Sequence, residues 1–351
     1  MTIVSPYNSH KIGVLYVILI YFVLIIHSAL VDLEGMPITR ALVDFFGNFG
    51  LSVASVPLFY AISGLLFFKG GLTAASDCYS KIVKRIRTLL VPYVLWNLIY
   101  ASFFIVLSMI PQVSGFVSSD VSSTISHNGL LQNLYYLFIQ PVGFHLWFLR
   151  DLIIYVLLSP LIFLCIKKYP WVTLLLVYLS FGWLTNIGIT YFILGGIIAL
   201  HYELDDVNRF HSGKILLICS LIYILNAVVC YFHIPYIVSM VNIEYVRQLI
   251  SLSGIIAFWG GYDFLYRRCA CLNTRRLLSA IIPFTFFIYL FHEPSLNIVK
   301  KMGILMLGKS DIGLSIVYLI TPIIMVVLSC MMGKCLKTIT PRVYGILVGG
   351  R

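Results

Sequence analysis

The sequence predicts an all-α integral membrane protein, a bundle of about ten transmembrane helices. Of its 351 residues, 60% are hydrophobic and 11% are charged, whereas a soluble domain usually carries about 25% charged residues. The mean hydropathy is +0.99, and many apolar runs approach the roughly 20 residues that cross a bilayer. We therefore expect one membrane domain over residues 1–351, with no separate soluble domain.

Ten apolar segments are expected to cross the membrane, and the fifth and sixth are the shortest. They are 13–32, 49–68, 89–110, 146–166, 170–185, 187–202, 214–233, 246–266, 277–298 and 313–335. Most lysines and arginines fall in the connections on the side of the N-terminus, which fits the positive-inside rule with both termini cytoplasmic. The net charge of +11 therefore reflects topology and does not indicate a nucleic-acid partner.

The third segment begins with a cluster of cations in YSKIVKRIRTLLVPYVLWNLIY, residues 79–100. Lys84 and Arg87 are three residues apart and share a helix face, and Arg85 lies between them. Two interpretations stay open. The cluster either sets topology and contacts lipid head groups, or it binds an anionic ligand such as a phosphate group. Pro92 is expected to kink the helix just inside the membrane.

The segment GFHLWFLRDLIIYVLLSPLI, residues 143–162, carries His145, Trp147, Arg150 and Asp151 at the outer end of a span. Tryptophan is common at a membrane interface. An Arg–Asp pair in an apolar run indicates a functional site by default, but a structural pair that fixes helix packing is an equal alternative.

Two further segments place ionisable residues in the outer halves of their spans. His27 lies in YFVLIIHSALVDLEG, residues 21–35, and His292 and Glu293 lie in FTFFIYLFHEPSLN, residues 284–297. Tyr289 precedes His292 by three residues and Glu293 by four, so it can neighbour either. We expect His27 and His292 to line one cavity, where an imidazole is the usual group for abstracting a proton near neutral pH.

Taken in order, VPLFYAISGLL, KRIRTLLVPYVLWN, HLWFLRDLIIYVLLSP and IYLFHEP, behind a first-span histidine, resemble the membrane acyltransferase 3 family. The family's first-helix motif is a basic residue, ten intervening residues and a histidine. His27 matches the histidine, but Tyr16 occupies the basic position, and Lys11 lies roughly on the opposite helix face. The family's Arg-x-x-Arg motif appears here as Lys84 to Arg87.

The resemblance implies ten core helices in the bacterial cytoplasmic membrane and transfer of an acyl group, usually acetyl, from cytoplasmic acyl-CoA to a glycan hydroxyl. In that scheme His27 is the base, and Lys84, Arg85 and Arg87 hold the CoA phosphates. Weaker expectations assign substrate or oxyanion contacts to His145, Trp147, Arg150, Asp151, Tyr289, His292 and Glu293. The expected partners are a glycan or lipid-linked sugar, membrane lipids and a glycan synthesis or export complex, without a metal.

Two other functions compete with acyl transfer. Several spans with buried ions and proline breaks also suit a transporter or exporter of a glycan or small solute, although the sequence shows no repeated halves. A scaffold subunit of a glycan synthesis complex is the third. No Gly-x-Ser-x-Gly elbow is present, so a serine acyl-enzyme is not indicated, and direct transfer or a transient acyl-histidine remain.

Overall fold

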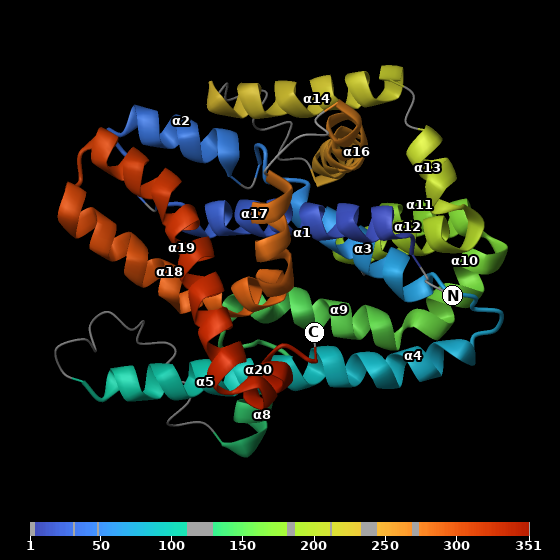
Figure 1. Cartoon of the computed structure of the whole chain (residues 1–351), viewed down its shortest axis with the longest axis horizontal. Helices are drawn as coiled ribbons and strands as arrows, with labels where there is room; N and C mark the ends of the chain where they lie inside the picture. The colour runs from blue at the N-terminus through green and yellow to red at the C-terminus, as the bar shows by residue number, and fades with distance from the viewer. Residues whose placement is uncertain are drawn as a thin grey trace. The chain divides into compact units, whose positions relative to one another are not determined.

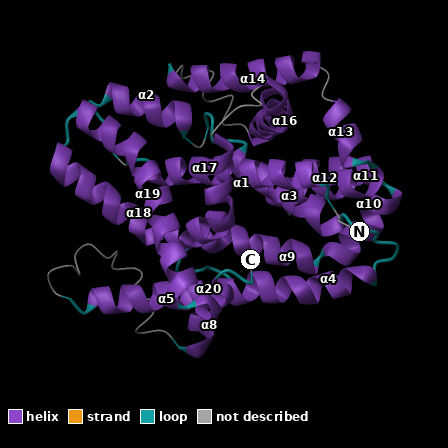
Figure 2. Cartoon of the chain, in the orientation of Figure 1, coloured by secondary structure: helices purple, strands orange, loops and turns teal. Residues whose placement is uncertain are grey.

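A computed structural model describes residues 4–30, 32–47, 49–110, 129–180, 187–210, 213–232, 244–268 and 274–350. The described residues form helices and connecting turns without a strand (Figure 2). The helices of the first half (Figure 1) are α1 Pro6–Ser28, α2 Pro37–Phe46, α3 Ser55–Phe68, α4 Asp77–Arg85, the π-helix η1 Ile86–Leu90, α5 Val91–Ser108, α8 Leu130–Phe138, the 3-10 helix η2 Phe144–Leu146, α9 Trp147–Leu157, α10 Ser159–Lys168 and α11 Pro170–Leu179. Those of the second half are α12 Ile187–His201, α13 Leu204–Phe210, α14 Gly213–Tyr231, α16 Glu244–Arg268, α17 Thr274–Ile281, the 3-10 helix η3 Ile282–Phe284, α18 Thr285–Leu307, α19 Asp311–Ile339 and α20 Pro341–Leu347.

The chain divides into two compact units. Unit 1 comprises residues 1–73 and 161–332, and unit 2 comprises residues 74–160 and 333–351.

Helix α1 is the central element of unit 1. Pro6 occupies its first turn, and the Ser5 side chain accepts a hydrogen bond from the backbone N–H of Asn8, a combination that favours a helix start. The helix packs against α3, α16 and α18. Its C-terminal half shares an apolar core with α18 and α19, made by Ile20, Val23, Leu24, Ile288, Leu296 and Met325.

Helices α3 and α12 of unit 1 pack closely because glycines face backbone atoms. A Cβ on Gly195 would lie 1.9 Å from the carbonyl oxygen of Ala61, and one on Gly64 would lie 2.0 Å from that of Phe192. Small residues allow this approach between membrane helices. The small residues Ser63 and Gly64 in the segment VPLFYAISGLL therefore serve helix packing.

In unit 2, α4, η1 and α5 run together as one helical stretch from Asp77 to Leu107. Pro92 lies in the first turn of α5, directly after the π-helical turn. Proline lacks a backbone N–H, and a π-turn is one way in which a helix absorbs such an interruption. The kink predicted at Pro92 is thus a local change of helix type in a continuous stretch.

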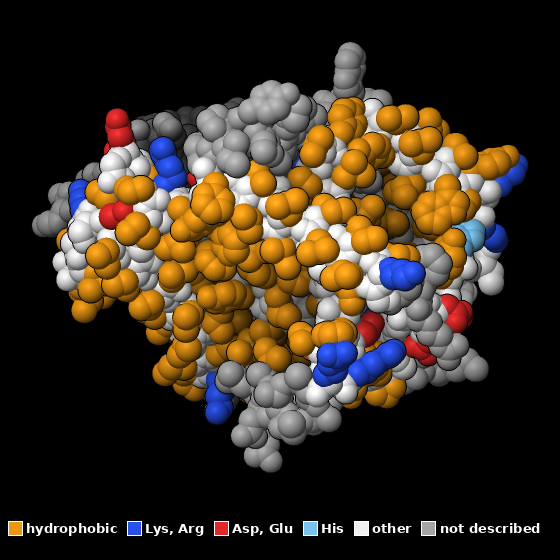
Figure 3. Space-filling view, turned by 90° about the horizontal axis from the view of Figure 1, so that it is seen from above, with side chains coloured by type: hydrophobic (Ala, Val, Ile, Leu, Met, Phe, Trp, Pro, Cys, Tyr) orange, Lys and Arg blue, Asp and Glu red, His pale blue; other side chains and the backbone are white. Residues whose placement is uncertain are grey.

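The predicted number of about ten spans is not confirmed. Among the described residues, five helices are long and apolar enough to cross a membrane, or six if α9 and α10 form one bent span. Helices α3, α11 and α12 are apolar but shorter, and α18 contains Glu293 and two lysines. Hydrophobic side chains nevertheless cover much of one face (Figure 3), and the exposed Leu217, Leu221 and Leu225 of α14 follow the spacing of a lipid-facing stripe.

Candidate functional site

The candidate site in unit 1 lies where the end of α1 meets α18. His27 is half-buried in the last turn of α1, and His292 is fully buried in α18. Their ring centroids are 5.2 Å apart, with an angle of 34° between the ring planes. The predicted proximity of the two histidines is therefore observed.

The tautomer of His292 follows from its backbone contact. Nδ1 lies 2.7 Å from the carbonyl oxygen of Tyr289. Because a carbonyl oxygen only accepts hydrogen bonds, Nδ1 carries the proton, and Nε2 is the acceptor atom of the neutral ring. This contact fixes the orientation of the imidazole beside His27. The aromatic ring of Tyr289 lies 6.2 Å from that of His292.

Glu293 follows His292 directly in the sequence and lies at a break in α18. Its backbone is non-helical, with φ −101° and ψ 141°, immediately before Pro294. The carboxylate is buried and accepts a hydrogen bond of 2.6 Å from Nδ2 of Asn297. A carboxylate held in this apolar region needs such partners, because burying a charge without them is costly.

Lys300 completes the cluster, although it lies beyond the segment 277–298 that the sequence predicts to cross the membrane. It lies in α18, and its ammonium group donates to the carbonyl oxygens of His27 and Ala29 at 3.4 and 3.1 Å. It also interacts electrostatically with Glu293. A cation at a helix C-terminus satisfies the last carbonyl groups and complements the helix dipole, so Lys300 fixes the turn that carries His27.

Two α18 residues of the cluster, Asn297 and Lys300, were not predicted from the sequence. They differ in whether their spacing along the chain could have indicated them. Asn297 follows Glu293 by four residues, a spacing that brings side chains together on a helix. The contacts of Lys300 with α1 gave no such signal, because they go to backbone carbonyls about 270 positions away in the sequence.

Tyr16, which occupies the family's basic position, stacks on Phe59 of α3 with ring centroids 5.5 Å apart. Lys11 does not replace that basic residue. It is completely buried at the opposite end of α1, where Nζ lies 2.9 and 2.8 Å from the two carboxylate oxygens of Asp263.

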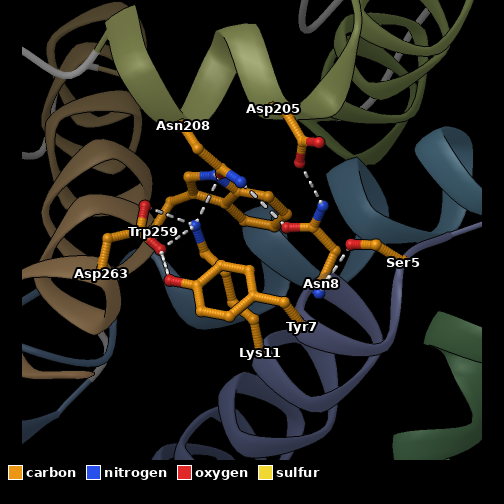
Figure 4. Close-up of polar contacts among 8 residues, drawn as sticks. All are labelled: Ser5, Tyr7, Asn8, Lys11, Asp205, Asn208, Trp259 and Asp263. Carbon is orange, nitrogen blue, oxygen red and sulfur yellow. Dashed lines mark hydrogen bonds and ion pairs between the residues drawn. The ribbon is translucent and has the colours of Figure 1, made fainter. Parts of the chain in front are cut away.

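The partners of Lys11 form a polar network at the junction of α1, α13 and α16 (Figure 4). Nζ also donates to Oδ1 of Asn208 at 3.0 Å and lies 4.1 Å from the ring centroid of Trp259. The hydroxyl of Tyr7 donates to Asp263 at 2.5 Å, and Asn8 donates to Asp205 at 3.0 Å. A buried ion pair with this many hydrogen bonds satisfies its charges locally, so we assign Lys11 to the packing of α1.

The remaining predicted residues lie in unit 2. Lys84 is exposed and Arg85 half-buried at the end of α4, while Arg87 is exposed in η1. The structure thus places the three cations where α4 continues into the π-helical turn η1.

Arg150 and Asp151 form an ion pair, with Nη2 2.6 Å from Oδ1 of Asp151. Nε of Arg150 donates to the same oxygen at 2.8 Å, and Nη1 donates to the carbonyl oxygen of Ile139 at 2.6 Å. These contacts tie α9 to the segment after α8 and favour the structural alternative for this pair.

His145 is buried in η2, 3.5 Å from the hydroxyl of Tyr100, and its ring meets that of Tyr100 edge to face. Trp147 is half-buried at the first position of α9, with its ring 6.4 Å from that of Phe148. Both residues therefore pack within unit 2.

Comparison with known proteins identifies the family. The family model described as "Acyltransferase domain", the acyltransferase 3 family, matches residues 10–334. The chain is 27% identical to the succinoglycan biosynthesis protein ExoH of Rhizobium meliloti (strain 1021) over 369 residues, covering 98% of this chain and 92% of that protein. No solved structure matches the chain. The resemblance read from the motifs is confirmed: the chain belongs to the acyltransferase 3 family of membrane proteins and is an acyltransferase.

Proposed function

We propose that this protein transfers an acyl group from a cytoplasmic acyl-CoA to a hydroxyl group of a glycan or lipid-linked sugar. The main support for this proposal is the close pairing of His27 with His292. The pair lies near the buried carboxylate of Glu293, at the apolar core of α1, α18 and α19. Support for a glycan acceptor comes from the relative, whose name refers to succinoglycan biosynthesis. We propose that the transferred acyl group is acetyl.

The chemistry requires a base for the attacking hydroxyl and donors for the developing oxyanion. His27 takes the proton as the sugar oxygen bonds to the thioester carbonyl carbon, and the C–S bond breaks to release the CoA thiolate, which is then protonated. The protonated imidazole is a suitable source of that proton. His292, fixed by Tyr289, orients the ring of His27, and Glu293 balances the positive charge that forms during transfer.

The other assignments concern the donor and the location of the protein. Lys84, Arg85 and Arg87 bind the CoA phosphates, because arginine offers paired donors to phosphate oxygens and lysine a compact charge. We place the protein in the bacterial cytoplasmic membrane, with both termini in the cytoplasm.

The test compares His27→Gln with His10→Gln in cells that carry or lack the protein. His10 is a matched control because it lies in the same helix, with Nδ1 2.8 Å from the hydroxyl of Tyr262. Base-labile acyl groups on surface glycan are measured by mass spectrometry, and the membrane level of each variant by immunoblot. We expect His27→Gln to lower acylation by about 10²–10⁴-fold and His10→Gln to leave it unchanged.

Full acylation in the His27→Gln variant would contradict the role of His27. A transporter would be indicated instead if the purified protein in lipid nanodiscs showed no release of free CoA from acetyl-CoA in the presence of isolated surface glycan, while cells lacking the protein accumulated that glycan internally.

A further inference from the structure

A groove of about 610 Å³ lies in unit 2, between η1, the start of α5 and the segment that begins at α20. We call it the α20 groove. It is lined by Arg87, Val91, Pro341, Arg342, Gly345, Ile346, Gly349 and Gly350. Its volume lies within the roughly 300–1,000 Å³ that is typical of small-molecule sites.

The wall of the groove is held by specific contacts. Nε1 of Trp96 in α5 donates to the carbonyl oxygen of Leu347 at 3.1 Å, and Tyr344 and Val348 are buried. Gly349 has φ +67°, and a Cβ there would lie 2.4 Å from the carbonyl oxygen of Thr88. The backbone after α20 therefore lies directly against the π-helical turn, and the groove is a built feature of unit 2.

The charges of the groove are all of one sign. Arg87 and Arg342, which come from distant parts of the sequence, are its ionisable residues, and no carboxylate is among the lining residues. Neither guanidinium has an ion-pair partner among the residues that the structure describes. Two guanidinium groups at one groove favour a phosphate ester, which each can bind with paired hydrogen bonds.

The rest of the lining is apolar or glycine. Val91, Pro341 and Ile346 offer an apolar surface, and Gly345, Gly349 and Gly350 leave backbone exposed to a ligand. A ligand that suits this lining has phosphate groups attached to a flat or apolar body, as an adenine nucleotide does.

We propose that the α20 groove binds the 3′-phosphoadenosine diphosphate end of coenzyme A, with Arg342 joining Arg87 as a phosphate ligand. This inference rests on the proposed acyl-CoA donor and adds to it a residue and a chain segment outside the cation cluster of α4 and η1. It also assigns the residues after α19 to donor binding.

The experiment measures binding of adenosine 3′,5′-bisphosphate, a fragment of coenzyme A without the thioester arm, to the full chain in phosphatidylcholine nanodiscs by calorimetry. We expect Arg342→Gln and Arg87→Gln each to weaken binding by about tenfold or more, the effect of losing a hydrogen bond to a charged group. Lys334→Gln is the matched control, since Lys334 is an exposed cation of the same unit outside the groove, and we expect a change of less than about twofold.

A second variant tests the wall without removing charge. Gly349→Ala must displace the backbone from Thr88, so it is also expected to weaken binding of the bisphosphate. Circular dichroism and thermal unfolding of each variant establish that the fold is retained.

Unchanged binding in Arg342→Gln would overturn the inference. The inference would also be overturned if the wild-type protein did not bind the bisphosphate but bound short-chain phosphatidylglycerol in an Arg342-dependent manner. The groove would then be a lipid head-group site. If acyl transfer from acetyl-CoA persists with an unchanged KM in Arg342→Gln, the groove assignment alone fails. If wild-type protein transfers nothing from acyl-CoA, the proposed function itself fails.

Discussion

At the scale of single residues, the ammonium group of Lys300 determines how the end of α1 is held. It reaches the carbonyl oxygens of His27 and Ala29 from another helix, beside the buried Glu293. The backbone of the proposed base is therefore attached to α18, the helix that also carries His292. Lys300 is a positioning residue in this arrangement, since its contacts go to the backbone of His27.

We predict that Lys300→Met lowers kcat for acyl transfer about tenfold and leaves the KM for acyl-CoA within about twofold of wild type. A cation at a helix end contributes at most about 2 kcal/mol in partly buried positions, so the variant should still fold. Lys300→Arg should restore most of kcat, because a guanidinium also donates to carbonyl oxygens.

Lys301→Met serves as the control, because Lys301 follows Lys300 directly in the sequence but has an exposed side chain. The measurement is initial rates over a range of acyl-CoA concentrations, with thermal unfolding of each variant. If Lys300→Met changed only the unfolding temperature and not kcat, Lys300 would have a structural role alone.

The residues that the sequence singled out are those with an unusual chemical context, and for two of them it predicted that they lie together. His27, His292 and Glu293 stand out because ionisable groups are rare in apolar spans, and two of them are indeed neighbours. The contact of Arg150 with Ile139 was not predictable, because its acceptor is a backbone oxygen in a connecting segment. The burial of Lys11 was equally hidden, since its carboxylate lies 252 residues away.

At the scale of elements, the sequence located most helices but not their lengths. Helix α3 occupies residues 55–68 of the predicted 49–68 span, and α11 ends at Leu179. Apolar composition continues past the point where a helix ends, so hydropathy alone does not mark its boundary. The π-helical turn before Pro92 also has no counterpart in a hydropathy pattern.

The contact between α3 and α12 leads to a prediction about helix packing. Gly195→Ala would insert a Cβ 1.9 Å from the carbonyl oxygen of Ala61. Because backbone cannot yield as a flexible side chain does, the helices must separate, and overpacking of this kind costs about 1–3 kcal/mol. We expect a lower unfolding temperature in detergent.

Gly261→Ala is the matched control in α16, where nothing lies within 4 Å of the added Cβ. Alanine is the better helix former by about 1 kcal/mol, so this variant should be as stable as wild type or slightly more stable. Equal unfolding temperatures for both variants would contradict the close packing of α3 on α12.

At the scale of the whole molecule, the number of membrane crossings determines where the termini lie. An odd number puts the two ends on opposite sides, and an even number puts them on the same side. Five helices of the described chain qualify as spans, or six with the bent pair α9 and α10. Helices α3, α11 and α12 are also apolar but shorter.

We predict that both termini are cytoplasmic, which requires an even number of crossings. Most basic residues then lie on the cytoplasmic side, as the positive-inside rule requires. The measurement uses two fusions in a bacterial host, with a fluorescent protein that matures only in the cytoplasm attached at either end. Fluorescence from one fusion but not from the other, at equal protein levels, would establish an odd number.

The ion pair of Lys11 has a consequence for how the protein is made. Its carboxylate partner, Asp263, follows it by 252 residues, so at the roughly 5–20 residues per second of translation the partner emerges about 13–50 s later. During that interval the lysine of the first helix has no Asp263, and its long side chain must reach the head-group region by snorkelling. We therefore expect helix α1 to reach its final depth only late in biosynthesis, when α16 enters the membrane and supplies the carboxylate of Asp263.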